Sequence, residues 1–401
     1  MPRVTLSRPA AFWSVAVLLV LMLAASGVPS PLYRVYAQEF GFGSGMITVV
    51  FAIYALALLV SLLVVGALSD HVGRRPVLAV ALVVEAVSMA LFWAADGVGW
   101  LLAARVVQGF ATGAMTGTFG AALLDTQAPA RPLGPLVNAA GPGLGLSLGA
   151  VVAGLAVEFV PSPTDWVFGS LTVLCLLGAV GVRWLPETSP RLPGALASLR
   201  PSVRVPASQR RAFLVVLPCL VATWALSGLY LSLSPSLVVS VFGVQDHLVG
   251  SLVILALTGT GAVGSTLMRT APAGRSMVVG SLSFAVGVGG TIVGLATGSL
   301  AGFFTAAVVS GFGFGTAFLG AMATVTRGVT PGERAGLLSA VFTVSYLGFS
   351  VPAIAAGLAS GPVGLETTAE VYGAGVILLA LVAVAGLAVQ QRRPAVAVPT
   401  R

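Results

Sequence analysis

The stretch AFWSVAVLLVLMLAASG at residues 11–27 returns in altered form as AFLVVLPCLVATWALSG at residues 212–228. A second pair, VQGFATG at 107–113 and VSGFGFG at 309–315, repeats at nearly the same offset of about 201 residues. Matches at one offset indicate that a unit of about half the chain is duplicated. Chance agreement between glycine-rich apolar segments is the alternative interpretation.

Twelve apolar runs of the length that crosses a hydrocarbon core, about 20 residues, occur along the chain. Backbone in lipid must satisfy its own hydrogen bonds, so these runs are expected to be helices. The sequence therefore predicts an all-α membrane protein with twelve transmembrane helices in two pseudo-symmetric six-helix bundles. The expected spans are 11–37, 45–68, 76–95, 99–125, 133–158, 165–184, 212–242, 247–268, 276–296, 299–326, 335–359 and 369–390.

The composition also points to the bilayer. Of the 401 residues, 57% are hydrophobic and 8% charged, whereas soluble proteins carry about 25% charged residues. The net charge of +8 comes from arginine alone, because the chain has no lysine. If both termini are cytoplasmic, all arginines except Arg34 and Arg105 fall in cytoplasmic segments, as the positive-inside rule expects. The prediction is a multi-pass protein of the cytoplasmic membrane, with no nucleic-acid partner.

Between the two halves lies PETSPRLPGALASLRPSVRVPASQRR, residues 186–211, which is rich in proline and arginine and too weakly apolar to form a core. The predicted organisation is an N-terminal bundle at 1–185, a cytoplasmic linker at 186–211 and a C-terminal bundle at 212–401. The N-terminus imitates a signal peptide, but the recurrence of its apolar segment in the second half argues against cleavage.

The stretch GALSDHVGRRPVL, Gly66 to Leu78, forms the turn between the second and third expected spans. Its glycines permit a tight turn, its acid lies at a helix terminus, and its arginines anchor the cytoplasmic face. An ordinary positive-inside turn is the alternative. The stretch resembles the loop motif G-x-L-x-D-x-x-G-R-R of the major facilitator superfamily, with matches at Gly66, Leu68, Asp70, Gly73, Arg74 and Arg75.

This resemblance implies a latch that closes the cytoplasmic side. Asp70 would face the start of the eleventh span near Arg334, and Arg74 would pair with Asp125 at the end of the fourth span. His71 stands where the family usually has arginine, so the resemblance assigns it no role. The predicted latch residues are Gly66, Asp70, Gly73, Arg74, Arg75, Asp125 and Arg334.

Two charged residues lie inside apolar spans, where a charge is costly and points to function. Arg105, in RVVQGFATGA, cannot lose its proton and needs a partner. This segment resembles the R-x-x-Q-G motif of the superfamily's proton-coupled exporters, in which the arginine influences a proton site. Glu85 lies mid-span and could hold a proton there, so both are proton-coupling candidates and possible partners. The alternatives are a snorkelling Arg105 and a neutral Glu85 bonded to a neighbouring helix.

The fifth span contains two incomplete versions of one glycine pattern. Both resemble the antiporter motif G-x-x-x-G-P-x-x-G-G of exporters, which is thought to form a bendable helix between the halves. Generic glycine packing is the alternative. The residues of this predicted helix are Gly141, Pro142, Gly145, Gly149 and Gly154.

Prolines and aromatic residues in the first, seventh and eleventh spans are candidates for a central substrate cavity. Broken helices commonly line such cavities, and aromatic rings could stack on an aromatic or cationic ligand. Packing is the alternative for the aromatic residues. The cavity candidates are Trp13, Pro31, Trp224, Tyr230 and Tyr346.

The sequence lacks nucleotide-binding and hydrolase motifs, and its two cysteines lie singly in apolar runs, so no enzyme, cofactor or metal site is expected. The resemblance implies a secondary transporter of the drug/proton antiporter branch. It would export a drug-like molecule or metabolite by alternating access, as a functional monomer in the lipid bilayer, driven by an ion gradient that is expected to be one of protons. Sodium coupling stays open. A proton-coupled uptake symporter, suggested by the likeness of PETSPR to a sugar-carrier motif, and a non-transporting receptor are alternatives.

Overall fold

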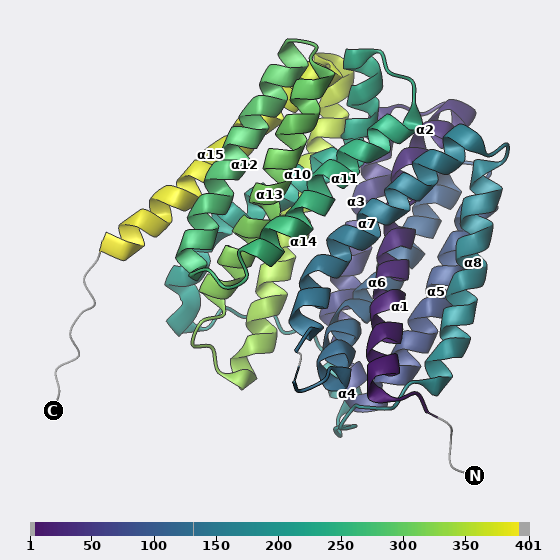
Figure 1. Ribbon diagram of the computed structural model, residues 1–401, viewed down its shortest axis with the longest axis vertical. Helices are drawn as coiled ribbons and strands as arrows, with labels where there is room; N and C mark the ends of the chain where they lie inside the picture. Colours follow the sequence, from purple (N-terminus) through teal and green to yellow (C-terminus); the bar gives the residue numbers. More distant parts are fainter. Residues whose placement is uncertain (1–4, 131, 393–401) are drawn as a thin grey trace.

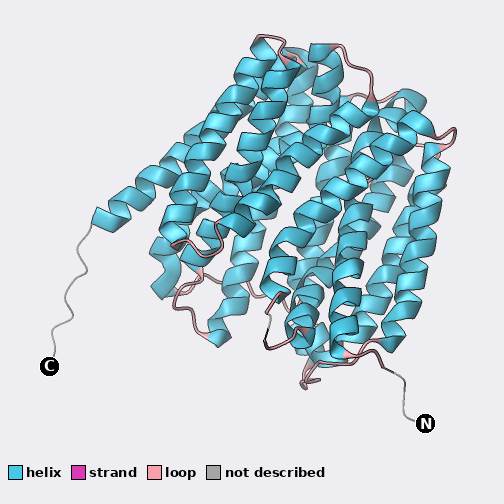
Figure 2. Cartoon of the chain, in the orientation of Figure 1, coloured by secondary structure: helices cyan, strands magenta, loops and turns pink. Residues whose placement is uncertain are grey.

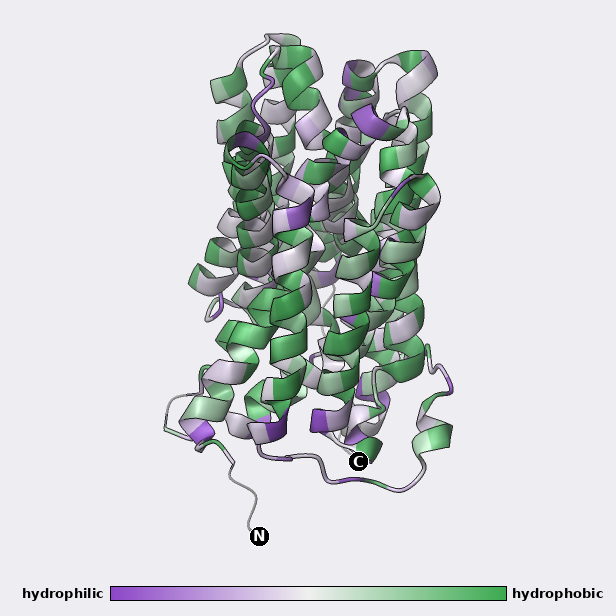
Figure 3. Cartoon of the chain, turned by 90° about the vertical axis from the view of Figure 1, so that its right-hand side faces the viewer, coloured by the Kyte–Doolittle hydropathy of each residue, from purple (hydrophilic) through white to green (hydrophobic). Residues whose placement is uncertain are grey.

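The structure, a computed structural model, describes residues 5–130 and 132–392. Within these residues the chain forms helices joined by short loops and contains no β-strand (Figure 2). Apolar residues cover most of the length of the helices (Figure 3). The all-helical fold that the apolar runs predicted is confirmed.

The helices that precede the linker form the N-terminal group (Figure 1). They are α1 (Arg8–Gly27), α2 (Pro29–Phe40), α3 (Ser44–Val65), α4 (Ser69–Val72), α5 (Arg74–Trp93), α6 (Val98–Thr126), α7 (Gly134–Phe159) and α8 (Pro163–Gly181).

The helices that follow the linker form the C-terminal group, and three short elements lie in the linker region. The short elements are η1 (Val182–Trp184), α9 (Ala195–Ser198) and η2 (Ala207–Gln209). The C-terminal group consists of α10 (Arg210–Phe242), α11 (His247–Leu267), α12 (Ala273–Ala296), α13 (Leu300–Val325), α14 (Pro331–Val363) and α15 (Leu365–Arg392).

Each of the twelve predicted spans corresponds to a long helix in the described residues, with α1 and α2 together forming the first. Eleven of these spans are long and apolar enough to cross a membrane by length and composition. The twelfth is α6, whose mean hydropathy is lowered by Arg105 and Gln108. The first span is interrupted at Val28, because Pro29 has no N–H to continue the hydrogen-bond ladder of α1.

The α4 turn and the linker lie at the same end of the bundle as the two ends of the described chain (Figure 1). We call this the linker end, and the opposite end, where α2 meets α3, the far end. Most helix contacts fall within a group, whereas α7 against α11 and α3 against α14 are the largest contacts between the groups. The division into bundles at 185 and 211 stays a prediction.

Small residues bring α3 and α14 together toward the far end. A Cβ on Gly357 would lie 1.8 Å from Oγ1 of Thr48, so a larger residue there would displace the helices. The hydroxyls of Ser44 and Ser360 are hydrogen-bonded at 2.9 Å. The two groups are therefore in close contact at this end.

The contact between α7 and α11 depends on glycine and hydroxyl residues as well. A Cβ on Gly154 would lie 2.3 Å from Oγ of Ser251, and one on Gly143 would lie 2.6 Å from the carbonyl oxygen of Thr258. The hydroxyls of Ser147 and Thr258 are 2.7 Å apart. Small residues at helix interfaces allow such close backbone approach in a membrane.

Candidate functional site

A buried polar network lies inside the N-terminal group. It consists of Glu85 on α5, Arg105 and Gln108 on α6, and Tyr33 on α2. The side chains of Glu85, Arg105 and Gln108 are fully buried, with 0% exposure. Arg105 and Gln108 are three residues apart on one helix, so their side chains lie on the same face.

Gln108 connects the two charged residues of this network. Its Nε2 donates to Oε1 of Glu85 at 2.9 Å and to the carbonyl oxygen of Ala25 at 3.1 Å. Its Oε1 accepts a hydrogen bond from Arg105, whose Nε donates to the hydroxyl of Tyr33. Glu85 and Arg105 are thus brought together through an amide and form no direct ion pair in the described chain.

The network keeps unused hydrogen-bonding capacity. Among the described residues, Oε2 of Glu85 and Nη2 of Arg105 are buried without a partner. A carboxyl oxygen in this position can take up a proton, since a neutral carboxyl group tolerates an apolar site better than a charged one. Full burial also removes the alternative in which Arg105 snorkels to the membrane surface.

Aromatic rings surround the Arg105 guanidinium. It lies 5.1 Å from the ring centre of Tyr33, 5.2 Å from Phe51 and 5.0 Å from Tyr54. These cation–π contacts stabilise a charge that has no carboxylate beside it. Phe51 and Tyr54 belong to α3, the helix that contacts the C-terminal group, so the network reaches the interface between the groups.

An interface aromatic cluster continues from Phe51 across that boundary. We define it as Phe51, Trp224, Tyr346 and Phe349. Phe51 stacks on Phe349 with ring centres 5.4 Å apart, and Trp224 lies edge-on to Tyr346 at 4.7 Å and to Phe349 at 6.2 Å. Two of the predicted cavity residues, Trp224 and Tyr346, are therefore neighbours where the groups meet.

The other cavity candidates lie elsewhere. Tyr230 is buried within the C-terminal group, where its hydroxyl is bonded to Thr291 at 2.6 Å and its ring stacks on Phe303. Pro31 is buried in α2 next to the helix break. The structure therefore does not bring Tyr230 or Pro31 to the interface aromatic cluster.

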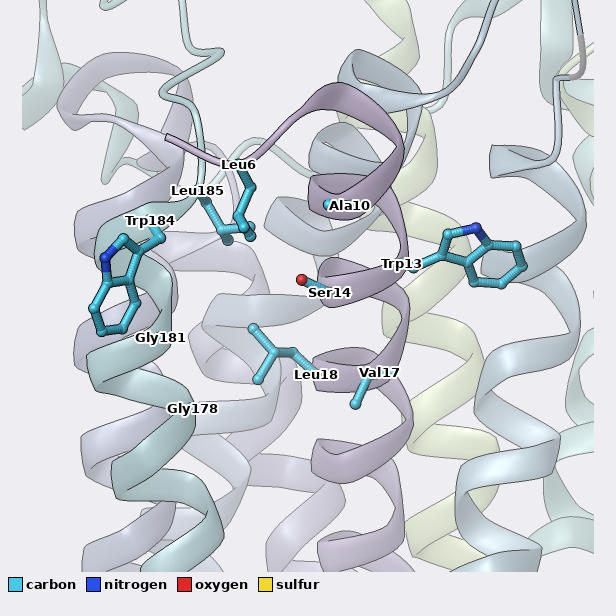
Figure 4. A pocket seen from close by; sticks show the side chains of 10 residues that line it. All are labelled: Leu6, Ala10, Trp13, Ser14, Val17, Leu18, Gly178, Gly181, Trp184 and Leu185. Carbon is cyan, nitrogen blue, oxygen red and sulfur yellow. The ribbon is translucent and has the colours of Figure 1, made fainter. Parts of the chain in front are cut away.

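Trp13 is 55% exposed on α1. Beside it, α1 and α8 enclose an apolar groove of about 490 Å³ at the linker end (Figure 4). Ser14 and Leu18 lie on the side of α1 that faces the groove, whereas the Trp13 ring points to the other side of the helix (Figure 4). This groove lies between two helices of one group and is separate from the interface aromatic cluster.

Three of the predicted latch residues, Asp70, Arg74 and Asp125, form a linker-end charge cluster. The Arg74 guanidinium forms an ion pair with Asp70, and its Nε lies 3.5 Å from Oδ2 of Asp125. The structure thus brings together Arg74 and Asp125, the pair that the loop-motif resemblance implied. Asp70 and Arg334 form no ion pair in the described chain, and the partner of Asp70 is Arg74.

Two further latch residues, Arg75 and Gly66, serve the packing of this turn. Arg75 donates to the carbonyl oxygens of Arg183 and Val182 at the end of the α8 region. A Cβ on Gly117 of α6 would lie 2.8 Å from the carbonyl oxygen of Gly66, so the turn lies directly against α6.

The linker supplies a partner that the sequence analysis missed. Glu187 accepts hydrogen bonds from the backbone N–H of Arg74 at 2.8 Å and of Arg75 at 3.3 Å, and so caps α5. Thr188 donates to Asp125 at 2.8 Å. Gly73 has a φ of +116°, and a Cβ there would lie 2.6 Å from Glu187. The signal was present in PETSPR, whose one acid is Glu187.

The predicted antiporter-type residues all lie on α7, which contacts both α1 and α11. A Cβ on Gly149 would lie 2.0 Å from the carbonyl oxygen of Ala24, and Gly141 and Gly145 also face α1 side chains. Gly154 instead faces α11, and Pro142 lies inside the helix. The glycine pattern therefore packs α7 on its own group as well as on the other.

Sequence reasoning also missed Gln108, Tyr33 and Phe51. Gln108 stands in the quoted RVVQG segment, one helical turn after Arg105, and that spacing was a usable signal. Tyr33 and Phe51 reach Arg105 from other helices. No pattern in a single sequence reveals such contacts.

These features define a polytopic helical membrane protein with a buried charged network beside the interface of two helix groups. The sequence matches the family described as Major Facilitator Superfamily over residues 15–353, so the chain belongs to that superfamily. It is therefore a multi-pass membrane transporter, not an enzyme.

Among curated relatives, the class C tetracycline resistance protein of Escherichia coli is 41% identical over 110 residues, which are 27% of each chain. Multidrug resistance protein D of Escherichia coli K12 is 27% identical over 183 residues, 43% of this chain and 45% of that protein. An uncharacterised transporter of Rickettsia felis is 30% identical over 166 residues, 41% and 39% of the two chains. The chain spans less than half the length of each of these relatives.

Solved structures resemble the whole fold. A bacterial homologue of the human lysosomal transporter Spinster superposes with a TM-score of 0.74 at 15% identity, covering 97% of this chain and 99% of that one. The nucleoside transporter NupG superposes with a TM-score of 0.72 at 14% identity, covering 94% and 99%. At these identities the likeness shows the fold alone.

Proposed function

We propose that this transporter exports a small organic molecule in exchange for a proton. The observation that carries the proposal is the buried network, in which the Glu85 carboxyl has one free oxygen and is linked through Gln108 to Arg105. A proton on Glu85 would change the hydrogen bonding of Gln108 and leave the charge of Arg105 without a counter-charge. That change would alter the contact of Arg105 with Phe51, the ring that stacks on Phe349 of the other group.

In this proposal the linker end faces the cytoplasm of a bacterial inner membrane, and both termini are cytoplasmic. The charge distribution supports this orientation by the positive-inside rule. The chain would work as a monomer, without a cofactor, and one helix group would rock against the other about the interface aromatic cluster. The driving force would be the proton gradient.

The linker-end charge cluster would hold one of the two alternating states. Arg74 joins Asp70 to Asp125, and Glu187 fixes the start of α5 on the same turn. In the other state Asp70 would exchange its partner for the start of α14 near Arg334. Ion pairs of partly exposed side chains are weak enough to exchange in this way.

Export is favoured by the relatives, two of which are named as resistance proteins. Uptake by proton symport is the second candidate. The observation that favours it is the PETSPR segment, which resembles a sugar-carrier motif and contacts the latch through Glu187, bonded to the Arg74 N–H, and Thr188, bonded to Asp125. A drug-like molecule or metabolite is the expected cargo in the first case, and a sugar or related metabolite in the second.

The test is transport in membrane vesicles with an imposed proton gradient, using a panel of dyes and antibiotics. We expect substrate movement opposite to the proton flux, loss of that movement with an uncoupler, and loss in Glu85→Gln. Glu158→Gln is the matched control, because Glu158 is an exposed carboxylate at the end of α7. Movement in the same direction as the protons would establish the symporter, and full activity of Glu85→Gln would remove the assigned proton site.

A further inference from the structure

The interface aromatic cluster contains a donor without an acceptor. Nε1 of Trp224 is buried and has no hydrogen-bond partner in the described residues, although the rest of the ring is only partly buried. A buried N–H without a partner costs free energy, so native proteins rarely leave one unpaired. Indole N–H is a donor only, so its missing partner must be an acceptor such as an oxygen atom.

Aromatic rings of both helix groups surround this donor. Phe51 comes from α3, Trp224 from α10, and Tyr346 and Phe349 from α14. Their mutual contacts are edge-on and stacked, with centres 4.7 to 6.2 Å apart. Planar ligands form the same stacked and edge-on contacts. The neighbourhood therefore suits an aromatic ring system.

Charge at this place disfavours a cation, and the proposed exchange for a proton disfavours an anion. Glu85 is the one acid of the chain in the middle part of a membrane-spanning helix, and Gln108 links it to Arg105, the residue that contacts the Phe51 ring of the cluster. A cationic ligand would find no counter-charge and would meet the positive guanidinium. An anion would be held most strongly when Glu85 is protonated, which opposes exchange for a proton.

We infer that the interface aromatic cluster binds an uncharged planar aromatic molecule that carries an oxygen acceptor for Nε1 of Trp224. The inference rests on the proposed function in taking the bound molecule to be the cargo and in excluding an anion, since that exclusion assumes exchange for a proton. The inference specifies the chemical class of the cargo, and measurements of ligand binding can test that class without a transport assay.

The probes are four compounds with one three-ring skeleton, measured by equilibrium dialysis against the purified full-length protein in lipid nanodiscs. Acridone is uncharged and has a carbonyl acceptor, acridan is uncharged and lacks it, N-methylacridinium is a cation, and acridine-9-carboxylate is an anion. We expect acridone to bind most tightly. Two like charges on the order of 10 Å apart at an effective dielectric constant of about 20 weaken binding roughly tenfold. Because Arg105 contacts the Phe51 ring of the cluster, the cation should bind at least that much more weakly than acridone.

Trp224→Phe removes the donor and keeps an aromatic ring. It should lower the acridone affinity relative to acridan by about fivefold, the value of a typical hydrogen bond. Trp166→Phe is the matched control, because Trp166 is 52% exposed on α8, outside the cluster, and it should leave this ratio unchanged.

Three results would overturn the inference: cation or anion binding as tight as that of acridone, an unchanged acridone-to-acridan ratio in Trp224→Phe, or no binding of any uncharged probe. These results are distinguishable from failure of the proposed function. Selective binding of acridone without proton-driven export would leave the ligand class standing and remove the exporter. Proton-driven export of cations alone would support the exporter and contradict the inferred ligand class.

Discussion

Replacing Gln108 by methionine should uncouple Glu85 from Arg105 while nearly preserving side-chain volume. The substitution removes the hydrogen bonds that Gln108 makes to Glu85, to Arg105 and to the carbonyl oxygen of Ala25. Hydrogen bonds to charged groups contribute about 1.5–3 kcal/mol each and neutral ones about 1 kcal/mol. Because these bonds share partners, we expect a total loss of about 3–5 kcal/mol, the range seen when one partner of a buried pair is removed.

The informative measurement is a double-mutant cycle of Gln108→Met with Glu85→Met. Unfolding of the purified protein by dodecyl sulfate in mixed micelles, followed by circular dichroism, gives the free energy for each variant. In the Glu85→Met background, Gln108→Met no longer breaks the 2.9 Å bond to the carboxyl group. The two changes should therefore fall short of additivity by about 1.5–3 kcal/mol.

The matched control pairs Gln108→Met with Glu158→Met, since Glu158 is exposed and shares no partner with Gln108. That pair should be additive to within about 0.5 kcal/mol. If Gln108→Met and Glu85→Met were equally additive, the amide would not connect the two charged residues, and the proposed coupling route would fail with it.

Three further changes test the turn and the interface. Gly73→Ala places a Cβ at a backbone φ of +116°, 2.6 Å from Glu187. It should lower the free energy of unfolding by roughly 1–3 kcal/mol, measured by thermal unfolding. Wild-type stability of the variant would show that Glu187 can move away from the added Cβ without cost. Gly357→Val should abolish transport, because even its Cβ would lie 1.8 Å from Oγ1 of Thr48 and would hold the far end open. Retained turnover would mean that this contact is not needed in the cycle. Asp70→Asn should slow transport severalfold in vesicles while leaving insertion intact, and unchanged turnover would remove its role in the latch.

The apolar runs predicted the position of every membrane-spanning helix to within a few residues, because span length is set by the bilayer and not by tertiary contacts. The pairing of Arg74 with Asp125 could also be predicted from the sequence, because the resemblance to the loop motif, whose residues have a fixed spacing, implied it. The prediction for Asp70 differs from the structure, in which Asp70 forms an ion pair with Arg74 across the non-helical Gly73.

The interior of the site could not be predicted in the same way. Glu85 and Arg105 were expected to be partners, yet the register of α5 against α6 places the Gln108 amide between them. Register depends on packing between helices, and a single sequence does not encode it in any local pattern. The same reason separates Tyr230 from Trp224, although both lie on α10: one turns into its own group and the other toward the interface.

The position of the buried network explains how a proton could influence the movement of the helix groups. Phe51 contacts the Arg105 guanidinium on one side and stacks on Phe349 of the opposite group on the other. The contact with Arg105 lies within one group, whereas the stack on Phe349 breaks or shifts when α14 moves against α3. In the proposed exchange, a change in the charge balance at Arg105 would therefore act on a ring that belongs to the interface between the groups. From this geometry we expect Phe51→Leu to weaken the dependence of transport on the proton gradient more than it weakens ligand binding.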